Sequence, residues 1–233
     1  MSWISEPFLA FDVESTGVSV ESDRIVTATT VWIDGADLDT SSWLIDPGVP
    51  IPEAATAVHG ISDGHVLAHG RPPAECIAEI AGVLRETWAA GRPVVAFNAS
   101  YDLTILDREC RRHGHPLLDV GPVLDPYVID KHVSYRRGKR TLEAQCEHYQ
   151  VTHGGAHDAT ADAIAAARVL WRIARRYPTV ASKTLAELHA AQVEWAREQA
   201  ASFADYLRKQ GRTDHLPDGQ WPIRARQASA VAA

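Results

Sequence analysis

The stretch that decides the fold is Phe8-Leu9-Ala10-Phe11-Asp12-Val13-Glu14-Ser15-Thr16-Gly17. Its apolar start, residues 8–11, predicts a buried strand, because it is a short, continuous apolar run with two phenylalanines, which favour strands. Side chains alternate between the two faces of a strand, so Asp12 and Glu14 point the same way, roughly 6–7 Å apart. Two carboxylates at the end of an apolar strand repel each other and lose hydration, and a divalent cation would remove both penalties. Taken alone, the pair is more typical of a solvated strand end that enters a polar turn.

The composition is that of a soluble globular chain. It has 233 residues, 45% of them hydrophobic and 23% charged, enough for one large domain or a domain with an extension. No apolar stretch has the length of a membrane span and the first residues lack the pattern of a signal peptide, so we expect no membrane contact. The three cysteines form no metal-ligand spacing, which favours a reduced, cytoplasmic protein.

The net charge of −7 argues against wide, non-specific coating of nucleic acid. It leaves room for a local basic groove, because the field at a site depends on the charges nearby. The candidate is a cluster of four cations within five positions: Arg136, Arg137, Lys139 and Arg140.

Working outward, the pattern changes from a strand meander to alternating strands and helices. We expect further strands at 24–34, 39–46 and 93–97, and a loop with short helical pieces at 47–73. Helices are expected at 74–90, 101–114, 123–133, 141–149, 157–177 and 183–210. This order predicts a mixed sheet covered by helices. Residues 212–233 are polar and contain prolines, and we expect them to be extended or disordered.

Two further sets of polar residues stand where elements begin. Asn98 and Asp102 follow the strand at 93–97, and a carboxylate in the first turn of a helix is also favourable for structural reasons alone. His157 and Asp162 lie at the start of an alanine-rich helix. Positions five apart differ by about 140° around a helix, so the two can meet only if His157 precedes the first turn. We interpret Asp158 as a helix-start residue and not as a ligand.

Three stretches, taken together and in this order, resemble the three motifs of the DEDDh exonucleases. They are Asp12-x-Glu14-Ser15-Thr16-Gly17, Asn98-x-x-x-Asp102 and His157-x-x-x-x-Asp162. This DnaQ-like superfamily includes the proofreading subunit of bacterial DNA polymerase III. The resemblance covers about residues 7–177, and stretches 54–62 and 123–142 are also similar to the family. Three positions depart from the family pattern, none of them charged: Ser15 and Pro126 stand where threonine is usual, and Tyr101 where phenylalanine is common.

The resemblance implies an α/β, RNase H-like exonuclease fold, with a mixed five-stranded sheet flanked by helices. Residues 1–178 would form the exonuclease domain and 179–233 a C-terminal helical extension with a flexible tail. Carboxylates are hard oxygen ligands, and Asp12, Glu14, Asp102 and Asp162 would hold two Mg²⁺ or Mn²⁺ ions. His157 would be the general base that takes the proton of the attacking water. The residues expected to contact the substrate are Ser15, Thr16, Gly17, His59, Phe97, Asn98, Arg136, Lys139 and Arg140.

The first hypothesis is therefore a metal-dependent 3′→5′ exonuclease that releases nucleoside 5′-monophosphates, with single-stranded DNA favoured over RNA. The alternatives are an exonuclease directed at RNA or oligoribonucleotides, and a non-catalytic nucleic-acid-binding or polymerase-accessory module. A Rossmann-type nucleotide binder is excluded, because no GxGxxG loop follows a strand.

The helix expected at 183–210 lies outside the resemblance and carries a broad apolar stripe. It either packs back on the core or forms a contact with a second copy or a protein partner. Gln192 and Gln199 lie inside this stripe, and buried amides need hydrogen-bond partners. We therefore expect a contact of partly polar character and not a deep core position.

Overall fold

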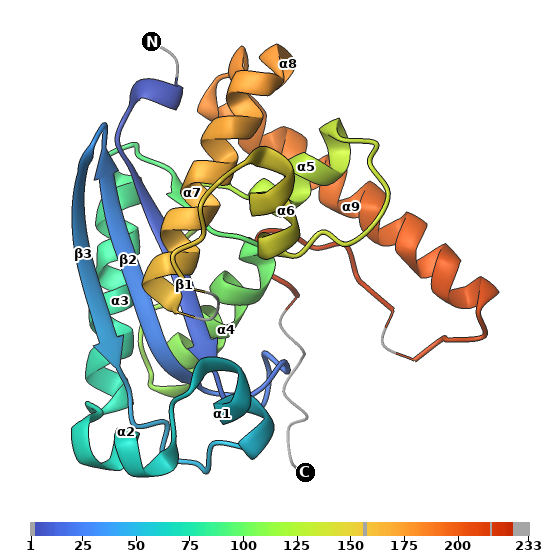
Figure 1. The fold of residues 1–233 in the computed structure, drawn as a ribbon. Helices are drawn as coiled ribbons and strands as arrows, with labels where there is room; N and C mark the ends of the chain where they lie inside the picture. Colours follow the sequence, from blue (N-terminus) through green and yellow to red (C-terminus); the bar gives the residue numbers. More distant parts are fainter. Residues whose placement is uncertain (1–2, 156–157, 215, 226–233) are drawn as a thin grey trace.

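The computed structural model describes residues 3–155, 158–214 and 216–225, and it has the predicted α/β architecture (Figure 1). A mixed five-stranded sheet has the order β3-β2-β1-β4-β5. The first three strands are antiparallel, whereas β4 and β5 run parallel to β1. The strands are β1 (Phe8–Ser15), β2 (Ile25–Asp34), β3 (Asp37–Leu44), β4 (Val94–Val95) and β5 (Val123–Leu124).

The fifth strand corrects one element of the sequence prediction. Residues 123–133 were expected to be one helix, but Val123–Leu124 pair with β4 and helix α5 (Pro126–Val133) begins only afterwards. Pro126 is the physical reason. A proline fits the first position of a helix and forces the preceding residue into an extended conformation, as found at Asp125 (φ −116°, ψ 104°). Asp125 then caps the helix by accepting a hydrogen bond from the backbone N–H of Tyr127.

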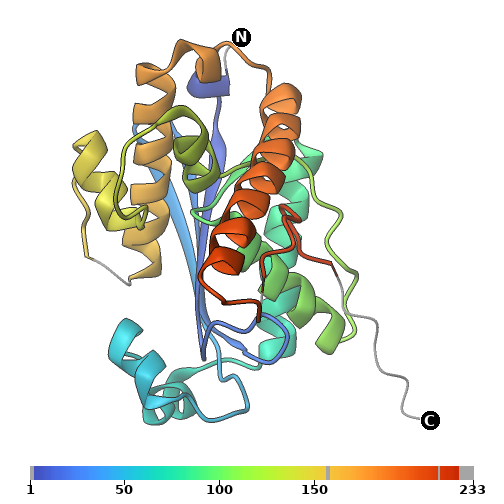
Figure 2. The same ribbon diagram turned by 90° about the vertical axis from the view of Figure 1, so that its right-hand side faces the viewer.

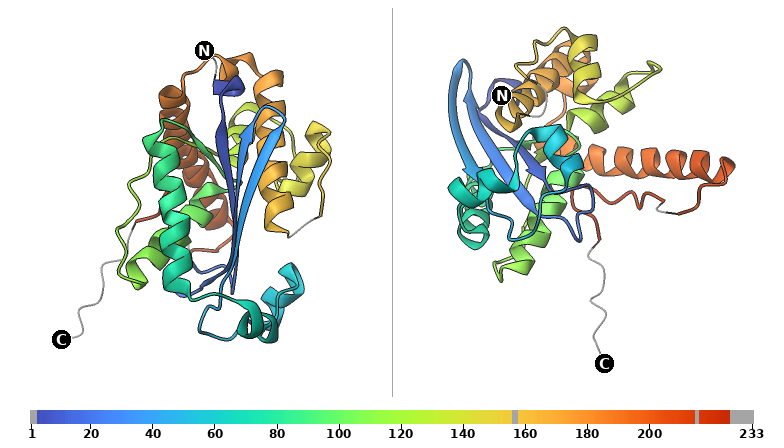
Figure 3. Two further views of the ribbon diagram at one scale, coloured as in Figure 1. Left: turned by 90° about the vertical axis from the view of Figure 1, so that its left-hand side faces the viewer. Right: turned by 60° about the horizontal axis from the view of Figure 1, so that its bottom comes forward.

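Helices cover both faces of the sheet. Figures 2 and 3 show helix α3 on one side of the strands and α7 on the other. The helical elements are η1 (Trp3–Ser5), α1 (Glu53–His59), α2 (Asp63–His69), α3 (Pro73–Ala89), α4 (Ala99–Arg112), α5, α6 (Leu142–Tyr149), α7 (Ala159–Arg176), α8 (Pro178–Ala181) and α9 (Leu185–Lys209). Within the described ranges, none of these helices combines the length and the hydropathy needed to cross a bilayer.

The alternation along β1 decides where its carboxylates go. Leu9, Phe11 and Val13 lie in the main core with residues of α3 and α4. Ala10 instead packs with Ala163 and other small or aliphatic side chains between the sheet and α7. Asp12 and Glu14 have the same parity as Ala10, so they lie on the α7 side of the strand. Small side chains at this contact let α7 come close to the carboxylates.

Helix α9 closes the edge of the sheet beside β5 in place of a sixth strand. The side chain of Gln192 is fully buried. Its Nε2 donates to the carbonyl of Val123 (2.9 Å), and its Oε1 accepts from the N–H of Asp125 (2.7 Å). His189 Nδ1 accepts from the N–H of Val123 at 3.0 Å. The expected polar partners are present, but the expectation that Gln192 avoids a deep position is wrong, because the open strand edge supplies the hydrogen bonds that a buried amide needs.

The chain after α9 returns along the protein as an extended segment, residues 216–225, which we call the strap. Figures 1 and 3 show α9 reaching beyond the sheet and the strap running back beside it. Trp221 belongs to the main core and donates its indole N–H to Asp125 Oδ2 at 3.3 Å. The N–H of Arg224 donates to Thr104 Oγ1 in α4 at 3.0 Å. The strap is extended, as expected, but it is packed and not free in solution.

Candidate active site

Three carboxylates from two elements meet where β1 ends. Asp12 and Glu14 come from β1, and Asp162 lies in the first turn of α7. One carboxylate oxygen of each lies within 4.8 Å of the others, and all three side chains are partly buried. Carboxylate oxygens at this mutual distance are the ligands that Mg²⁺ and Mn²⁺ prefer, so the residues present fit a divalent cation.

Asp102 lies against this cluster from the side of α4. Its side chain is buried, and its Oδ1 accepts a hydrogen bond of 3.2 Å from the backbone N–H of Val13. Val13 separates Asp12 and Glu14 in the strand, so this bond holds Asp102 next to both. Among the neighbouring charges that raise the pKa of Asp12, the Asp102 carboxylate has the largest effect. The structure thus brings together the four predicted carboxylates.

Crowding and burial shift the protonation of the cluster. Burial raises the pKa of Asp12 well above its usual range, and the carboxylates of Asp102, Asp162 and Glu14 raise it further. Burial, followed by the charges of Asp162 and Asp158, raises the pKa of Glu14 to about 7. All the neighbouring charges that cause these two shifts are carboxylates. A bound cation would offset both the repulsion and the lost hydration.

This electrostatic strain predicts how the stability of the metal-free protein depends on pH. Since the pKa of Glu14 is about 7 in the folded protein and 4.5 without its surroundings, the folded state holds a proton that the unfolded chain has released. The free energy of unfolding should therefore fall as the pH rises between these values. Added Mg²⁺ should raise the melting temperature more at about pH 8 than at about pH 5, because the ion needs ionised ligands.

Thermal melting with EDTA and with excess Mg²⁺, at several pH values, measures both effects. Glu14→Gln is the matched variant, since it removes the titrating proton with little change in shape, and it should flatten the pH dependence. Stability in EDTA that increases steadily from about pH 5 to about pH 8 would contradict the assigned electrostatics.

The turn after β1 is held by hydrogen bonds of its own side chains and of Tyr101 from α4. Tyr101 OH lies 2.5 Å from Ser15 Oγ and donates to the carbonyl of Gly17 at 2.5 Å. Buried Thr16 Oγ1 accepts from the N–H of Arg24 at 3.0 Å. A Cβ on Gly17 would lie 2.5 Å from Asp23 Oδ2, so a larger residue at this position would displace the Asp23 carboxyl group. Ser15 and Tyr101, two of the positions that depart from the family pattern, are therefore partners in one hydrogen bond.

Asn98 starts helix α4 in an unusual conformation. Its backbone is left-handed (φ 59°, ψ 44°), and its side chain makes no capping hydrogen bond and is exposed. Asp125 Oδ1 and Oδ2 hold the helix start instead, accepting from the N–H groups of Asn98 and Ala99, both at 3.0 Å. Phe97 lies edge-on to Tyr127, with ring centroids 5.7 Å apart. Asp125 is a residue that sequence reasoning did not select, and its position beside Pro126 was the available signal.

The predicted base, His157, lies outside the described residues. Asp158 caps α7 by accepting from the N–H of Ala161 at 2.9 Å, which confirms its reading as a helix-start residue. The structure adds a histidine that sequence reasoning missed: His153 Nε2 makes a short hydrogen bond with Asp162 Oδ1. Nothing in the sequence pattern separates His153 from the other ten histidines, because it stands nine positions before Asp162 in a loop.

Two of the predicted phosphate-binding cations are engaged within the protein. Arg136 Nη2 and Arg140 Nη1 both contact Asp130 Oδ2, at 3.3 and 2.5 Å, and the Asp130 side chain is fully buried. They therefore fold the loop between α5 and α6 around this carboxylate. Arg137 and Lys139 of the same cluster are exposed.

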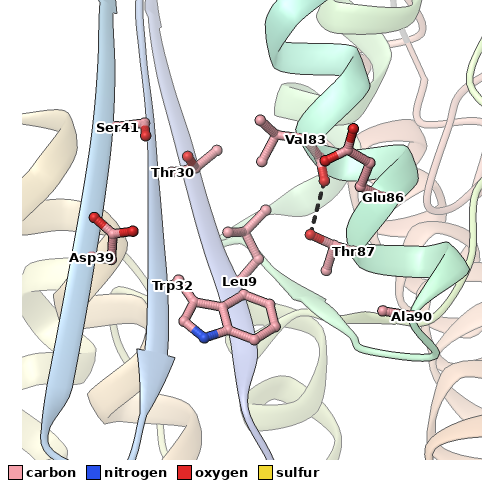
Figure 4. Close-up of a pocket in the computed structure, with 9 residues that line it drawn as sticks. All are labelled: Leu9, Thr30, Trp32, Asp39, Ser41, Val83, Glu86, Thr87 and Ala90. Carbon is pink, nitrogen blue, oxygen red and sulfur yellow. Dashed lines mark hydrogen bonds between the residues drawn. The ribbon is translucent and has the colours of Figure 1, made fainter.

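His59 and one surface cavity lie apart from the four carboxylates. His59, the last residue of α1, accepts a hydrogen bond from the N–H of Ile61 through Nδ1 (3.1 Å). A cavity of about 320 Å³ lies between the first three strands and α3. Figure 4 shows its two carboxylates, Asp39 and Glu86, on opposite walls, and Thr87 bonded back to Val83. None of the four clustered carboxylates lines this cavity, so it is separate from the candidate site.

Comparisons with known proteins agree with this geometry. A model of the RNase_T family, described as exonuclease, matches residues 9–170. The chain is 28% identical over 170 residues to the PolC-type DNA polymerase III of Lacticaseibacillus paracasei, which covers 72% of this chain and 11% of the polymerase. The chain is 26% identical over 188 residues to the PolC-type DNA polymerase III of Caldanaerobacter subterraneus subsp. tengcongensis. This match covers 80% of this chain and 13% of the polymerase. The chain thus spans roughly a tenth of these relatives.

Solved structures with the same fold include two nucleases in complex with DNA. Escherichia coli exonuclease I in complex with a dT13 oligonucleotide superposes with a TM-score of 0.64 at 17% identity, over 75% of this chain and 42% of that one. Exonuclease X in complex with 5′ overhanging duplex DNA superposes with a TM-score of 0.55 at 20% identity, over 79% of this chain and 99% of that one. At these identities the likeness shows the fold, and it confirms the predicted RNase H-like class.

Proposed function

The chain belongs to the exonuclease family whose model matches residues 9–170, and from this premise we propose that it is a metal-dependent 3′→5′ exonuclease. Its products are nucleoside 5′-monophosphates released from a free 3′ end. The observation that carries the proposal is the convergence of Asp12, Glu14 and Asp162 within 4.8 Å, with Asp102 bonded to the strand between the first two. A module that only binds nucleic acid has no use for such a cluster, because it repels a polyphosphate.

The four carboxylates would hold two Mg²⁺ ions. Such ions, when bound, stabilise the charge that develops on the attacking and leaving oxygens of the scissile phosphate. Asp12 is best placed to serve both, because Glu14, Asp102 and Asp162 all contribute to its electrostatic environment. Asp102 is oriented by the N–H of Val13, and a ligand held by a second hydrogen bond keeps its direction.

The protein's own groups position the substrate around these ligands. The turn with Ser15, Thr16 and Gly17 is fixed by Tyr101, so its backbone groups present one geometry to the terminal nucleotide. The exposed side chain of Asn98 stands at the start of the helix that carries Asp102. Phe97, His59, Arg136, Lys139 and Arg140 remain proposed substrate contacts, and the exposure of Lys139 suits a phosphate contact better than the Asp130-bound arginines.

His157 is the proposed general base, and His153 is the competitor that the structure supplies. A histidine with a pKa of about 6.5 can take a proton from water near neutral pH. If His157 has this role, His157→Ala should remove the rise of kcat with pH and lower kcat by about two to four orders of magnitude. His153→Ala is the matched variant, because it removes an imidazole that bonds to Asp162 and stands four positions before His157 in the sequence. We expect the His153→Ala protein to keep the rise of kcat with pH. If His153→Ala loses this rise and His157→Ala keeps it, His153 and not His157 is the general base.

DNA is the proposed substrate, with single strands favoured over RNA. The support is that the relatives with matching sequence are DNA polymerases and that both superposed nucleases are in complex with DNA. An exonuclease directed at RNA or short oligoribonucleotides is the alternative. The test is degradation of matched single-stranded DNA, duplex DNA and RNA, each labelled at the 5′ end, with Mg²⁺ and with EDTA. Release of mononucleotides and a stepwise shortening from the 3′ end are expected; absence of Mg²⁺-dependent shortening on all three substrates would overturn the proposal.

The division of the chain and its setting are also proposals. Residues 1–178 would form the exonuclease domain, and 179–233 an extension whose helix α9 packs on β5 and α5. A second copy or a protein partner would have to bind the far half of α9, because Leu188 and Gln192 are already buried. Three free, buried cysteines fit a reducing cytoplasm.

A further inference from the structure

Two adjoining cavities form one groove that leads away from the candidate active site. The first, of about 540 Å³, begins at Asn98 and Ser100 and lies between α5, α9 and the strap. The second, of about 510 Å³, continues between α5 and the far half of α9. Both are lined by Lys131, Gln199 and Phe203, so the two cavities adjoin at these side chains. One end of the groove thus reaches the helix start that carries Asp102, and the other end lies on α9.

Aromatic rings follow this groove at its surface. Tyr127 lies near the active-site end, with Lys131 Nζ 4.8 Å from its ring centroid. Phe203 and Tyr206 form a stacked pair on α9, with centroids 6.2 Å apart and planes inclined by 13°. These two side chains are 50% and 55% exposed, so each offers a ring face to solvent. Aromatic faces in a row are the platforms on which unpaired bases stack.

Charges of both signs lie near the groove. Tyr135, which is 96% exposed and lines the second cavity, directly precedes the basic cluster with exposed Arg137 and Lys139. Glu198 and Asp218 also line the groove, so its walls are not uniformly basic. This lining therefore favours stacking over charge as the main source of binding energy for a ligand in the groove.

We propose that this groove binds the single-stranded nucleic acid upstream of the scissile bond, with Phe203 and Tyr206 as stacking platforms. Both side chains and the strap lie beyond residue 170, outside the part of the chain that matches the family. The proposal rests on the proposed exonuclease function for the identity of its ligand as a substrate. It favours a single strand over a duplex, because bases can stack on side chains only when they are unpaired.

The test compares a long and a minimal substrate. The long one is an oligothymidylate of about a dozen residues, long enough to fill a groove of this kind. The minimal one is the p-nitrophenyl ester of thymidine 5′-monophosphate, which occupies only the catalytic end. In the double variant Phe203→Ala/Tyr206→Ala we expect KM for the oligothymidylate to rise by about tenfold or more, and hydrolysis of the ester to stay unchanged. Leu67→Ala is the matched control, since it removes a 74% exposed apolar side chain from α2, away from the groove. It should leave KM for the oligothymidylate unchanged.

Direct binding separates this proposal from the proposed function. Fluorescence anisotropy of the labelled oligothymidylate in EDTA, which stops hydrolysis, should show weaker binding to the double variant by the same factor. If the unaltered protein hydrolyses neither substrate but the double variant still loses oligonucleotide binding, the exonuclease proposal is wrong and the groove proposal stands. Equal binding by both proteins overturns the groove proposal, as does a double variant whose only change is its oligomeric state in size-exclusion chromatography, which would identify a protein contact instead.

Discussion

Replacing Asp12 with asparagine should reduce hydrolysis by at least about three orders of magnitude while making the metal-free protein more stable. The loss follows from removing a ligand that contributes to charge stabilisation in the transition state, an effect typically of several kcal/mol. The gain follows from the raised pKa of Asp12, which reports that its charge is unfavourable where it lies. Activity and stability therefore move in opposite directions at this position, as expected for a site that binds metal.

The measurements are single-turnover hydrolysis in Mg²⁺ and thermal melting in EDTA at about pH 8, where the carboxylates of the unfolded chain are ionised. Asp158→Asn is the matched control. Asp158 also raises the pKa of Glu14, but its carboxylate caps α7, and asparagine caps a helix equally well. This control should stay within a few-fold of the unaltered rate. A well-folded Asp12→Asn protein with near-native hydrolysis would remove Asp12 from the metal site.

The carboxylates could be predicted from the sequence because their positions follow from local rules. A two-residue spacing on a strand puts Asp12 and Glu14 on one face, and that face is the one that α7 covers. Asp102 and Asp162 each lie in the first turn of a helix that packs on the sheet. Their grouping with Asp12 and Glu14 comes from the resemblance of the three motifs, in their order, to the DEDDh exonucleases, because each motif alone is also typical of an ordinary helix start or strand end.

The remaining features depend on contacts between distant segments, which no local pattern encodes. Asp125 holds the start of α4 across 26 residues, and Trp221 reaches Asp125 across 96. His153 contacts Asp162 from a loop without periodicity. The two-residue strand β5 is too short for a pattern to distinguish it from the helix that follows. The pairing of Ser15 with Tyr101 likewise becomes visible only when β1 and α4 lie side by side.

Gln192 makes a further contact between distant segments, and this contact bears on stability. Its amide meets a donor and an acceptor on the open edge of the sheet, and it is completely shielded from water. Gln192 accepts a hydrogen bond from the backbone N–H of Asp125. The Asp125 carboxylate in turn accepts hydrogen bonds from the N–H groups of Asn98 and Ala99. Loosening this edge would therefore disturb the start of the helix that carries Asp102.

Gln192→Leu should lower the free energy of unfolding by roughly 2–6 kcal/mol, because two buried backbone groups lose their partners at about 1–3 kcal/mol each. Leucine keeps much of the volume, so the effect reports hydrogen bonding more than a cavity. Gln199→Leu is the matched control: Gln199 is only partly buried, and it donates to the carbonyl of Val128, which lies within helix α5. That change should lower stability by less than about 1 kcal/mol. Urea unfolding at equilibrium measures both, and a Gln192→Leu protein as stable as Gln199→Leu would show that the edge of β5 does not depend on α9.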